Sequence, residues 1–354
     1  MPDLQPAAQT KGPVVPRVHV IATGGTIASR TEHHSIGSVA SDSVEELLGV
    51  ITSGDREAHE DWPEHQVSGE QLFSVNSFRL TFADLRQIAL AVEQAVADPE
   101  VVGVVITHGT DTIEDTAFFL HCVYTGTVPV VITGAQKPAD DPAGDGPGNL
   151  REAILAAGHP HMADTGVTIS FAGRIHSARA TRKHHTLAPE PFTGGTEIAT
   201  VTHGKLVRQA TAAAGPGLPM PTAEIGSVQI PILEAGLGSS AQLARHLVED
   251  SASCGITLDG LVLMGTGAGN AADGFVTVVD LACQHHIPVV LATRTTFGPV
   301  VAIYGNGGGV DLVAAGAMLA GSLSPYQARI LLALLVCAGF AADQLADRFA
   351  EVAG

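Results

Sequence analysis

The sequence predicts an α/β protein with two domains, a larger N-terminal domain with a doubly wound sheet and a smaller C-terminal domain with a parallel sheet. Short apolar runs alternate with helical patterns from residue 18 onward, which is typical of a sheet covered by helices. A length of 354 residues suggests about two domains. The 40 glycines and the hydrophobic fraction of 45% suit an α/β chain with many tight turns, and an aromatic fraction of 4% predicts an aliphatic core.

Residues 17–208 carry the pattern of the N-terminal domain. They follow an arm, residues 1–16, which contains several prolines and is expected to be disordered. The runs VHVIAT, VVGVVI and VPVVIT predict buried strands. The stretch TFADLRQIALAVEQAVA has apolar residues at helical spacing, with Thr81 as the N-cap. A second helix is expected from Thr112 to about Tyr124, because Glu and Asp occupy its first turn.

A second α/β pattern follows a segment rich in Pro, Gly and Ala. That segment, residues 209–226, is the predicted linker between the domains. Residues 227–354 then show the expected strands VQIPIL, GLVLMG and IPVVLAT. Helical patterns lie around AQLARHLVED, VTVVDLACQHH, PYQARILLALLVC and ADQLADRFAEV. This alternation predicts the smaller parallel sheet.

Composition and charge exclude several classes of partner. There are 36 acidic and 18 basic residues, and the formal charge of −18 repels nucleic acid and anionic lipid. No apolar run is long enough to span a membrane, and the N-terminus lacks the apolar region of a signal peptide. The four cysteines are scattered in apolar contexts, which is typical of reduced thiols. We therefore expect a cytoplasmic protein that binds neither nucleic acid nor membrane.

Two turns place small polar residues where predicted strands end. THGTDT begins at Thr107, directly after VVGVVI, and ATGGTIASR ends the first strand. Ligands of open α/β sheets bind at the carboxyl ends of the strands, and paired glycines let the backbone approach a ligand closely. The first turn lacks the G-x-G-x-x-G pattern of dinucleotide binding. Each turn alone is also compatible with a purely structural role, because Thr and Asp cap helices well.

Taken together, the motifs ATGGTIAS, THGTDTIEDTAFFL, VVITGAQKP and GDGPGNLREAI resemble the bacterial-type L-asparaginase family. The resemblance runs from about Val18 to the final helices and is densest in the first domain. It implies hydrolysis of L-asparagine to L-aspartate and ammonia through a covalent acyl-enzyme, with neither cofactor nor metal. It also implies a homotetramer built as a dimer of dimers. Asp145 and Asn149 match family positions that we expect to shape a turn.

The resemblance also implies a set of site residues. Thr26 matches the nucleophilic threonine, and Thr110, Asp111 and Lys183 match a threonine–aspartate–lysine triad. A threonine hydroxyl needs a base to remove its proton, and a lysine serves as that base only when its neutral form is accessible. Asp111 is also expected to receive the α-ammonium of the substrate. The family's substrate-binding positions fall on Gly25, Ser77, Phe78, Gly109, Asp111 and Ala135.

The predicted lid departs from the family. The family carries a tyrosine on a mobile lid after the first turn, but the corresponding stretch, Ser29–Ala40, contains no tyrosine. His34 is the nearest match, and a histidine can act as a base near neutral pH. Adjacent histidines on a polar loop are more often solvent-exposed, so we expect another hydroxyl to replace the tyrosine, with Tyr304 as the candidate.

The second domain departs from the family as well. The loop GTGAGN resembles one that reaches the site of a neighbouring subunit, but its usual asparagine is replaced by Ala268, with Asn270 nearby. The family glutamate falls near Gly309, where Asn306 or Asp311 are possible substitutes. These changes bear on affinity and on the preference for asparagine or glutamine more than on the type of reaction.

Two other functions remain open at the level of the sequence. One is the amidase subunit of a tRNA-dependent amidotransferase, which shares these motifs but fits poorly with the strong acidity. The other is a catalytically weak regulatory homologue that binds an amino acid, which the missing lid tyrosine would explain. The intact pattern of Thr26, Thr110, Asp111 and Lys183 favours the enzyme.

Overall fold

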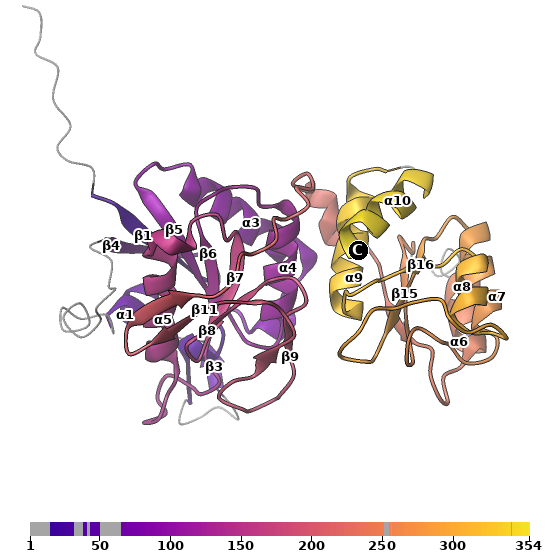
Figure 1. Cartoon of the computed structure of the whole chain (residues 1–354), viewed down its shortest axis with the longest axis horizontal. Coiled ribbons are helices and arrows are strands. Elements are labelled where there is room, and N and C mark those ends of the chain that lie inside the picture. The colour runs from indigo at the N-terminus through magenta and orange to yellow at the C-terminus, as the bar shows by residue number, and fades with distance from the viewer. Residues whose placement is uncertain are drawn as a thin grey trace, which may run out of the picture.

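The computed structural model describes residues 15–31, 38–40, 43–49, 65–250, 255, 257–340 and 342–354. Figure 1 shows two α/β bodies side by side, the N-terminal one in indigo to magenta and the C-terminal one in orange to yellow. Residues 1–14 of the arm expected at residues 1–16 lie outside the described part of the chain.

Among the described residues, eight strands form the sheet of the N-terminal domain, in the order β12-β11-β8-β7-β6-β5-β1-β4. They are β1 (Arg17–Ala22), β4 (Gln66–Gln71), β5 (Val101–Thr107), β6 (Val130–Thr133), β7 (Val167–Phe171), β8 (Arg174–Ser177), β11 (Glu197–Thr202) and β12 (Lys205–Arg208). Five neighbouring strands of this sheet, β7, β6, β5, β1 and β4, are parallel, as the alternation of strands and helices predicts.

The remaining strands of this sheet, β8, β11 and β12, add an antiparallel edge that the sequence pattern did not predict. Two-residue turns make two of these connections. Ala172 and Gly173 join β7 to β8, while His203 and Gly204 join β11 to β12, and all four residues have positive φ. Positive φ at both central residues is the type I′ geometry that suits the twist of a hairpin.

Both faces of the parallel strands are covered by helices. In β5, Val104 and Ile106 belong to the apolar cluster that includes the helices α3 and α4, whereas Val105 belongs to the cluster that includes α1 and α5. This alternation is the two-residue period of a strand buried on both sides. Thr81 caps α3 in a reciprocal capping box with Asp84, which confirms the predicted N-cap. The helices are α1 (Val44–Leu48), α3 (Phe82–Val96), α4 (Ile113–Val123) and α5 (Gly146–Gly158).

The C-terminal domain has a smaller parallel sheet in the order β13-β14-β15-β16, which confirms the prediction. Its strands are β13 (Ile232–Glu234), β14 (Leu261–Gly265), β15 (Val289–Thr293) and β16 (Met318–Leu319). Its helices are α6 (Ala241–Asp250), α7 (Phe275–Gln284), α8 (Gly309–Ala314), α9 (Pro325–Cys337) and α10 (Ala342–Ala353). The strand expected over VQIPIL is shorter than predicted, since β13 begins only at Ile232.

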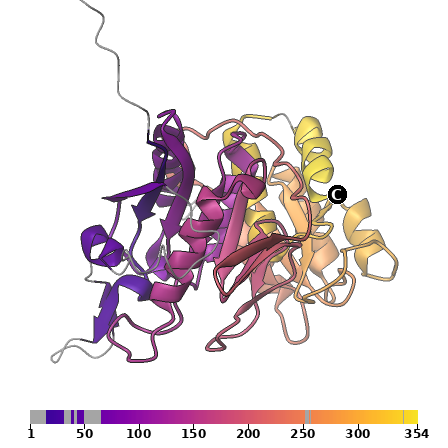
Figure 2. The ribbon, with the colours of Figure 1, turned by 60° about the vertical axis from the view of Figure 1, so that its left-hand side comes forward.

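The two bodies meet where α9 packs against α4 (Figures 1 and 2). One apolar cluster continues through this contact and includes Phe118 and Phe119 of α4 together with Leu331 of α9. The connecting segment lies against α4, because the backbone N–H of Leu218 donates to the carbonyl of Cys122 at 2.8 Å. Among the described residues, no helix is both long enough and apolar enough to cross a membrane.

Candidate active site

Three segments that follow neighbouring strands meet at the carboxyl edge of the larger sheet. Gly24 and Gly25 follow β1 with φ of 98° and 85°. A Cβ on Gly25 would lie 2.4 Å from the backbone nitrogen of Gly109, after β5, and a Cβ on Gly24 would lie 2.6 Å from the backbone nitrogen of Val75, after β4. Only glycine allows both the positive φ and this approach of one backbone to another. The two glycine turns of the sequence motifs are therefore in direct contact.

Thr26 follows this glycine pair and begins a 3₁₀ turn, Thr26–Ala28. Thr26 is half-buried, while Ile27 and Ala28 anchor the turn in the core. The chain then forms a hairpin in which β2 (Ser29–Thr31) pairs with β3 (Ser38–Ala40). This hairpin occupies the predicted lid, and His34 lies outside the described residues.

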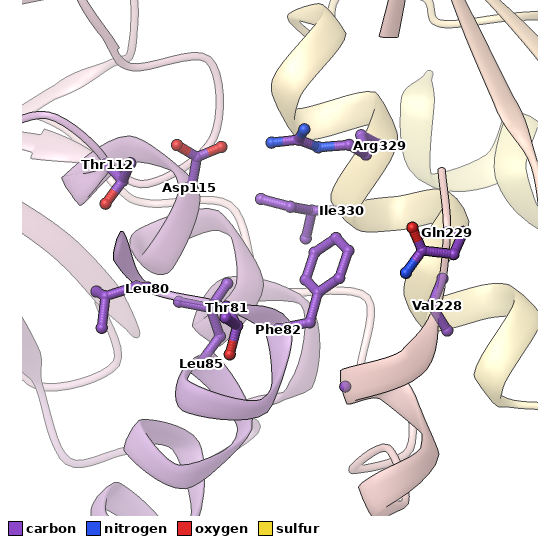
Figure 3. Close-up of a pocket in the computed structure, with 11 residues that line it drawn as sticks. Leu80, Thr81, Phe82, Leu85, Thr112, Asp115, Val228, Gln229, Arg329 and Ile330 are labelled. Carbon is purple, nitrogen blue, oxygen red and sulfur yellow. The ribbon is translucent and has the colours of Figure 1, made fainter. Parts of the chain in front are cut away.

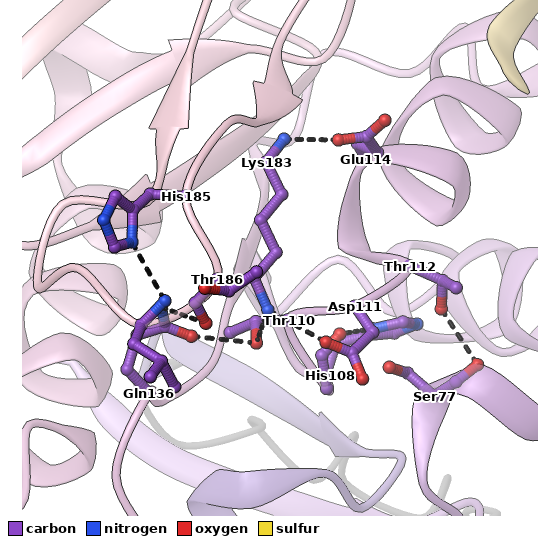
Figure 4. A network of polar contacts seen from close by, with 12 residues as sticks. Ser77, His108, Thr110, Asp111, Thr112, Glu114, Gln136, Lys183, His185 and Thr186 are labelled. Atoms are coloured by element: carbon purple, nitrogen blue, oxygen red, sulfur yellow. Dashed lines mark hydrogen bonds and ion pairs between the residues drawn. The ribbon is translucent and has the colours of Figure 1, made fainter. Parts of the chain in front are cut away.

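Lys183 reaches the turn after β5 from a distant part of the chain. It lies on β9 (Arg182–Lys183), which pairs with β10 (Phe192–Thr193). Its Nζ donates to Thr110 Oγ1 at 2.9 Å and to Asp111 Oδ1 at 2.9 Å (Figure 4). The side chain of Lys183 is 15% exposed and that of Asp111 is 59% exposed. The amine is therefore shielded from solvent while the carboxylate remains open to a ligand.

Gln136 also contacts Thr110, although the sequence analysis did not single it out. The hydroxyl of Thr110 donates to Gln136 Oε1 at 3.1 Å, and Gln136 Nε2 donates to the carbonyl of Ala188 at 3.0 Å. Because a carbonyl only accepts, the second bond fixes which end of the amide faces Thr110. The hydroxyl thus lies between a donor, Lys183, and an acceptor, Gln136 (Figure 4). The available signal was a polar residue, Gln136, three positions after the end of the strand in VVITGAQKP.

Asp145 holds the segment that carries Gln136. Its carboxylate accepts from the backbone N–H of Gln136 at 2.9 Å and from that of Lys137 at 2.9 Å. Asn149 Nδ2 donates to Asp145 at 3.2 Å and to the carbonyl of Gly134 at 2.9 Å. Asp145 and Asn149 therefore shape the turn after β6, which is the structural role expected of them.

Glu114, in the first turn of α4, contacts the backbone of Lys183. Its carboxylate accepts the backbone N–H of Lys183 and is 7% exposed (Figure 4). Burial raises the pKa of Glu114 to about 7, and the hydrogen bond from Lys183 opposes this rise. The negative charge of the neighbouring Asp115 adds to the rise. The backbone of the catalytic candidate Lys183 is therefore held by a carboxyl whose pKa is raised to about 7.

His108 supports the same turn from the interior. Its Nδ1 lies 2.8 Å from the carbonyl oxygen of Gly109, and its Nε2 lies 2.8 Å from Thr116 Oγ1. Burial lowers the pKa of His108 to about 4, so the ring is neutral at physiological pH. Because the carbonyl only accepts, we infer that Nδ1 carries the proton and that Nε2 accepts from the hydroxyl of Thr116. His108 thus braces the turn and is shielded from solvent.

The predicted substrate-binding residues differ in their exposure and in their contacts. Ser77 is 4% exposed, and a Cβ on Gly109 would lie 2.5 Å from its Oγ. Thr112 Oγ1 donates to the carbonyl of Ser77 at 2.9 Å, which holds this segment against α4. Phe78 is 65% exposed. Ala135 is fully buried, so neither its side chain nor its backbone is exposed.

The candidate residues of the second domain are tied within their own loops. Asn270 Oδ1 accepts from the backbone N–H of Gly309 at 3.2 Å, and Asp311 Oδ2 accepts from that of Gly307 at 2.6 Å. Tyr304 is 60% exposed. In the described part of the chain, no group of three or more His, Cys, Asp or Glu side chains could hold a metal ion.

Comparisons with known proteins cover almost the whole chain. The family model described as asparaginase, N-terminal, matches residues 17–212, and the glutaminase/asparaginase C-terminal domain matches residues 229–349. A probable L-asparaginase of Deinococcus radiodurans is 34% identical over 349 residues, covering 95% of this chain and 98% of that protein. L-asparaginase 2 of Bacillus subtilis is 29% identical over 334 residues, covering 90% and 82%.

A solved structure supports the fold. The crystal structure of a probable cytoplasmic L-asparaginase from Campylobacter jejuni has a TM-score of 0.79 and 24% sequence identity to this chain, covering 95% of this chain and 99% of its own. The similarity includes both domains. Because the sequence identity is only 24%, the similarity is evidence for the fold alone.

Proposed function

This chain belongs to the asparaginase family, and we propose that it hydrolyses the side-chain amide of L-asparagine to L-aspartate and ammonia. The observation that carries the proposal is the contact of Lys183 with both Thr110 and Asp111. This contact lies at the sheet edge where Gly25 meets Gly109, directly before Thr26. A hydroxyl, an amine and a carboxylate at one such edge are the groups that acyl transfer requires.

In the proposed mechanism, Thr26 is the nucleophile and the Lys183–Thr110 pair is its base. The uncharged amine of Lys183 accepts a proton by way of the Thr110 hydroxyl, and the oxygen of Thr26 attacks the amide carbon. Backbone N–H groups of the glycine turns stabilise the oxyanion that forms. The carbon–nitrogen bond then breaks, and the leaving nitrogen takes the proton from Lys183 to depart as ammonia. Water hydrolyses the remaining ester and restores Thr26.

Asp111 connects substrate binding to the ion pair of Lys183. Without substrate, Asp111 Oδ1 forms an ion pair with Lys183 Nζ at 2.9 Å. The substrate's α-ammonium, bound at the exposed Asp111 carboxylate, would compete with Lys183 for the same negative charge. Substrate binding would therefore weaken the ion pair and leave Lys183 Nζ in contact with Thr110 Oγ1, its other hydrogen-bond partner.

The test is ammonia release from L-asparagine, L-glutamine and D-asparagine, assayed side by side. Thr26→Ala, Thr110→Val and Lys183→Met should each remove most of the activity and leave the circular dichroism spectrum unchanged. The double variant Thr26→Ala/Lys183→Met should lose little more than either single one, because residues of one catalytic unit are not additive. Lys137→Met is the matched control, since that ammonium contacts only the carbonyl of Ala143 among the described residues. Near-normal turnover in a folded variant would exclude the proposed role of the residue replaced.

We also propose that the active protein is a cytoplasmic homotetramer built from two close dimers. The resemblance of GTGAGN to a loop that completes a neighbour's site supports this assembly. Closed symmetry is the rule among homo-oligomers. The similar structure from Campylobacter jejuni is that of a probable cytoplasmic L-asparaginase, which supports the location.

A further inference from the structure

A cavity of about 310 Å³ lies between the two domains, apart from the turns described above. It is bounded by the start of α3, the first turn of α4, the strip Val228–Gln229 and α9 (Figure 3). Its volume lies at the lower end of the range of about 300–1,000 Å³ that small-molecule pockets occupy. The apolar part of its wall consists of Leu80, Phe82, Leu85, Val228 and Ile330.

Two opposite charges face each other across this cavity. Asp115 projects from α4 and Arg329 from α9, and Figure 3 shows the carboxylate and the guanidinium directed at one another. Among the described residues they form neither a hydrogen bond nor an ion pair with each other. Asp115 Oδ1 and Arg329 Nε are both buried and lack a hydrogen-bond partner in the described chain. Burial raises the pKa of Asp115 to about 6, and the charge of Arg329 opposes this rise.

Buried polar atoms normally have partners, because an unmet donor or acceptor costs about 1–3 kcal/mol and a charged one more. Two unmet atoms of opposite charge on facing walls therefore describe a site for a molecule that carries both charges. The acidic residues closest to Asp115 along the chain are Glu114, on the same turn, and Asp111, four residues earlier. A ligand with net negative charge would be repelled by these groups, and a neutral zwitterion would not.

We propose that this interdomain cavity binds an α-amino acid with an apolar side chain. The ligand carboxylate pairs with the guanidinium of Arg329, and the ligand ammonium pairs with the carboxylate of Asp115. The side chain lies against Leu80, Phe82 and Ile330, in the apolar part of the wall. Arg is well suited to this role, since its planar fork matches the geometry of a carboxylate.

The position of the cavity gives such a ligand a route to the catalytic turn. A second cleft, of about 470 Å³, shares Thr112, Asp115 and Arg329 with the first and is also lined by Asp111 and Lys183. Asp115 and Asp111 are four residues apart, on the two sides of the N-cap of α4. A ligand that holds α9 against α4 would therefore act on the helix that follows Thr110 and Asp111. The proposal concerns binding, and it stands whether or not the chain hydrolyses asparagine.

The test is isothermal titration calorimetry on the full chain with L-leucine, 4-methylpentanoate and 3-methylbutylamine. Leucine carries both charges, and each of the other compounds keeps the branched side chain with only one charge. We expect saturable leucine binding with one site per chain, and binding of either analogue at least about tenfold weaker. Absence of saturable leucine binding would overturn the proposal.

Variants distinguish this cavity from the catalytic site. Asp115→Asn keeps the shape of the side chain and should weaken leucine binding at least about tenfold while strengthening the binding of 4-methylpentanoate. Arg329→Met should abolish the binding of both compounds, whereas Arg245→Met, on the exposed face of α6, should leave both unchanged. Leucine binding must also survive in Lys183→Met. Unchanged leucine binding in Asp115→Asn or Arg329→Met, or its loss only in Lys183→Met, would show that the ligand binds elsewhere.

Discussion

Replacing Glu114 by glutamine should stabilise the protein at high pH and have a much smaller effect at low pH. Glu114 is 7% exposed, and burial raises the pKa of its carboxyl from 4.5 to about 7. Glutamine keeps the size of the side chain and an oxygen that can accept the backbone N–H of Lys183. The substitution therefore removes the cost of ionisation and leaves the contact with Lys183 in place.

The direction follows from proton linkage. The folded state binds the proton of Glu114 more tightly than the unfolded state, so this group contributes full stability below about pH 4.5. That stability is lost as the pH rises through about 7, where the folded carboxyl ionises. The whole shift corresponds to about 3 kcal/mol. Between pH 5.0 and 8.5, the difference in unfolding free energy between Glu114→Gln and the parent should grow by about 2–3 kcal/mol.

Urea denaturation of both proteins at several pH values measures this difference. Titrating groups that do not interact with Glu114 cancel because they are present in both proteins, whereas the charge of Asp115 is part of the shift of Glu114 that is being measured. Glu93→Gln on α3 is the matched control, since Glu93 is exposed. A difference for Glu114→Gln that stays constant across this pH range would refute the reasoning, because the carboxyl would then titrate alike in the folded and unfolded states.

Three further predictions concern the glycine turn, the lid and the assembly. Gly25→Ala should lower the unfolding free energy by about 2 kcal/mol or more and abolish activity. The added Cβ would lie 2.4 Å from the backbone nitrogen of Gly109, at a residue whose φ is 85°. An unfolding free energy equal to that of the parent would contradict the close approach of the two turns. Tyr304→Phe should lower kcat and His34→Ala should leave it nearly unchanged, whereas a loss of about 10²–10⁴-fold in His34→Ala would identify His34 as a base. Full activity in both variants would show that neither residue replaces the lid tyrosine. Light scattering should give the mass of a tetramer, and a monomeric mass in an active sample would exclude this assembly.

Local signals in the sequence predicted most of the fold. The hydrophobic run VVGVVI, bounded by a helix on each side, became β5, and the Thr81 cap began α3 one residue later. These features depend on residues close together in the chain, where propensity and capping act. The antiparallel edge was missed, although Gly173 and Gly204 each stand second in a two-residue turn of positive φ. That pattern is a weak signal where neither Asn nor Asp precedes the glycine.

Contiguous and specific motifs were enough to identify the family and the residues of the glycine turns. The sequence also pointed to Lys183, but only through the resemblance. The fold was needed to show that Lys183 Nζ contacts Thr110 across 73 residues of sequence. It was also needed to show that Gln136 contacts Thr110 and that Glu114 accepts the backbone N–H of Lys183. Likewise, the gap between Asp115 and Arg329 exists only because α4 and α9 pack together. Such contacts depend on which faces of distant elements meet, and burial in those contacts decides charge states that local sequence leaves undetermined.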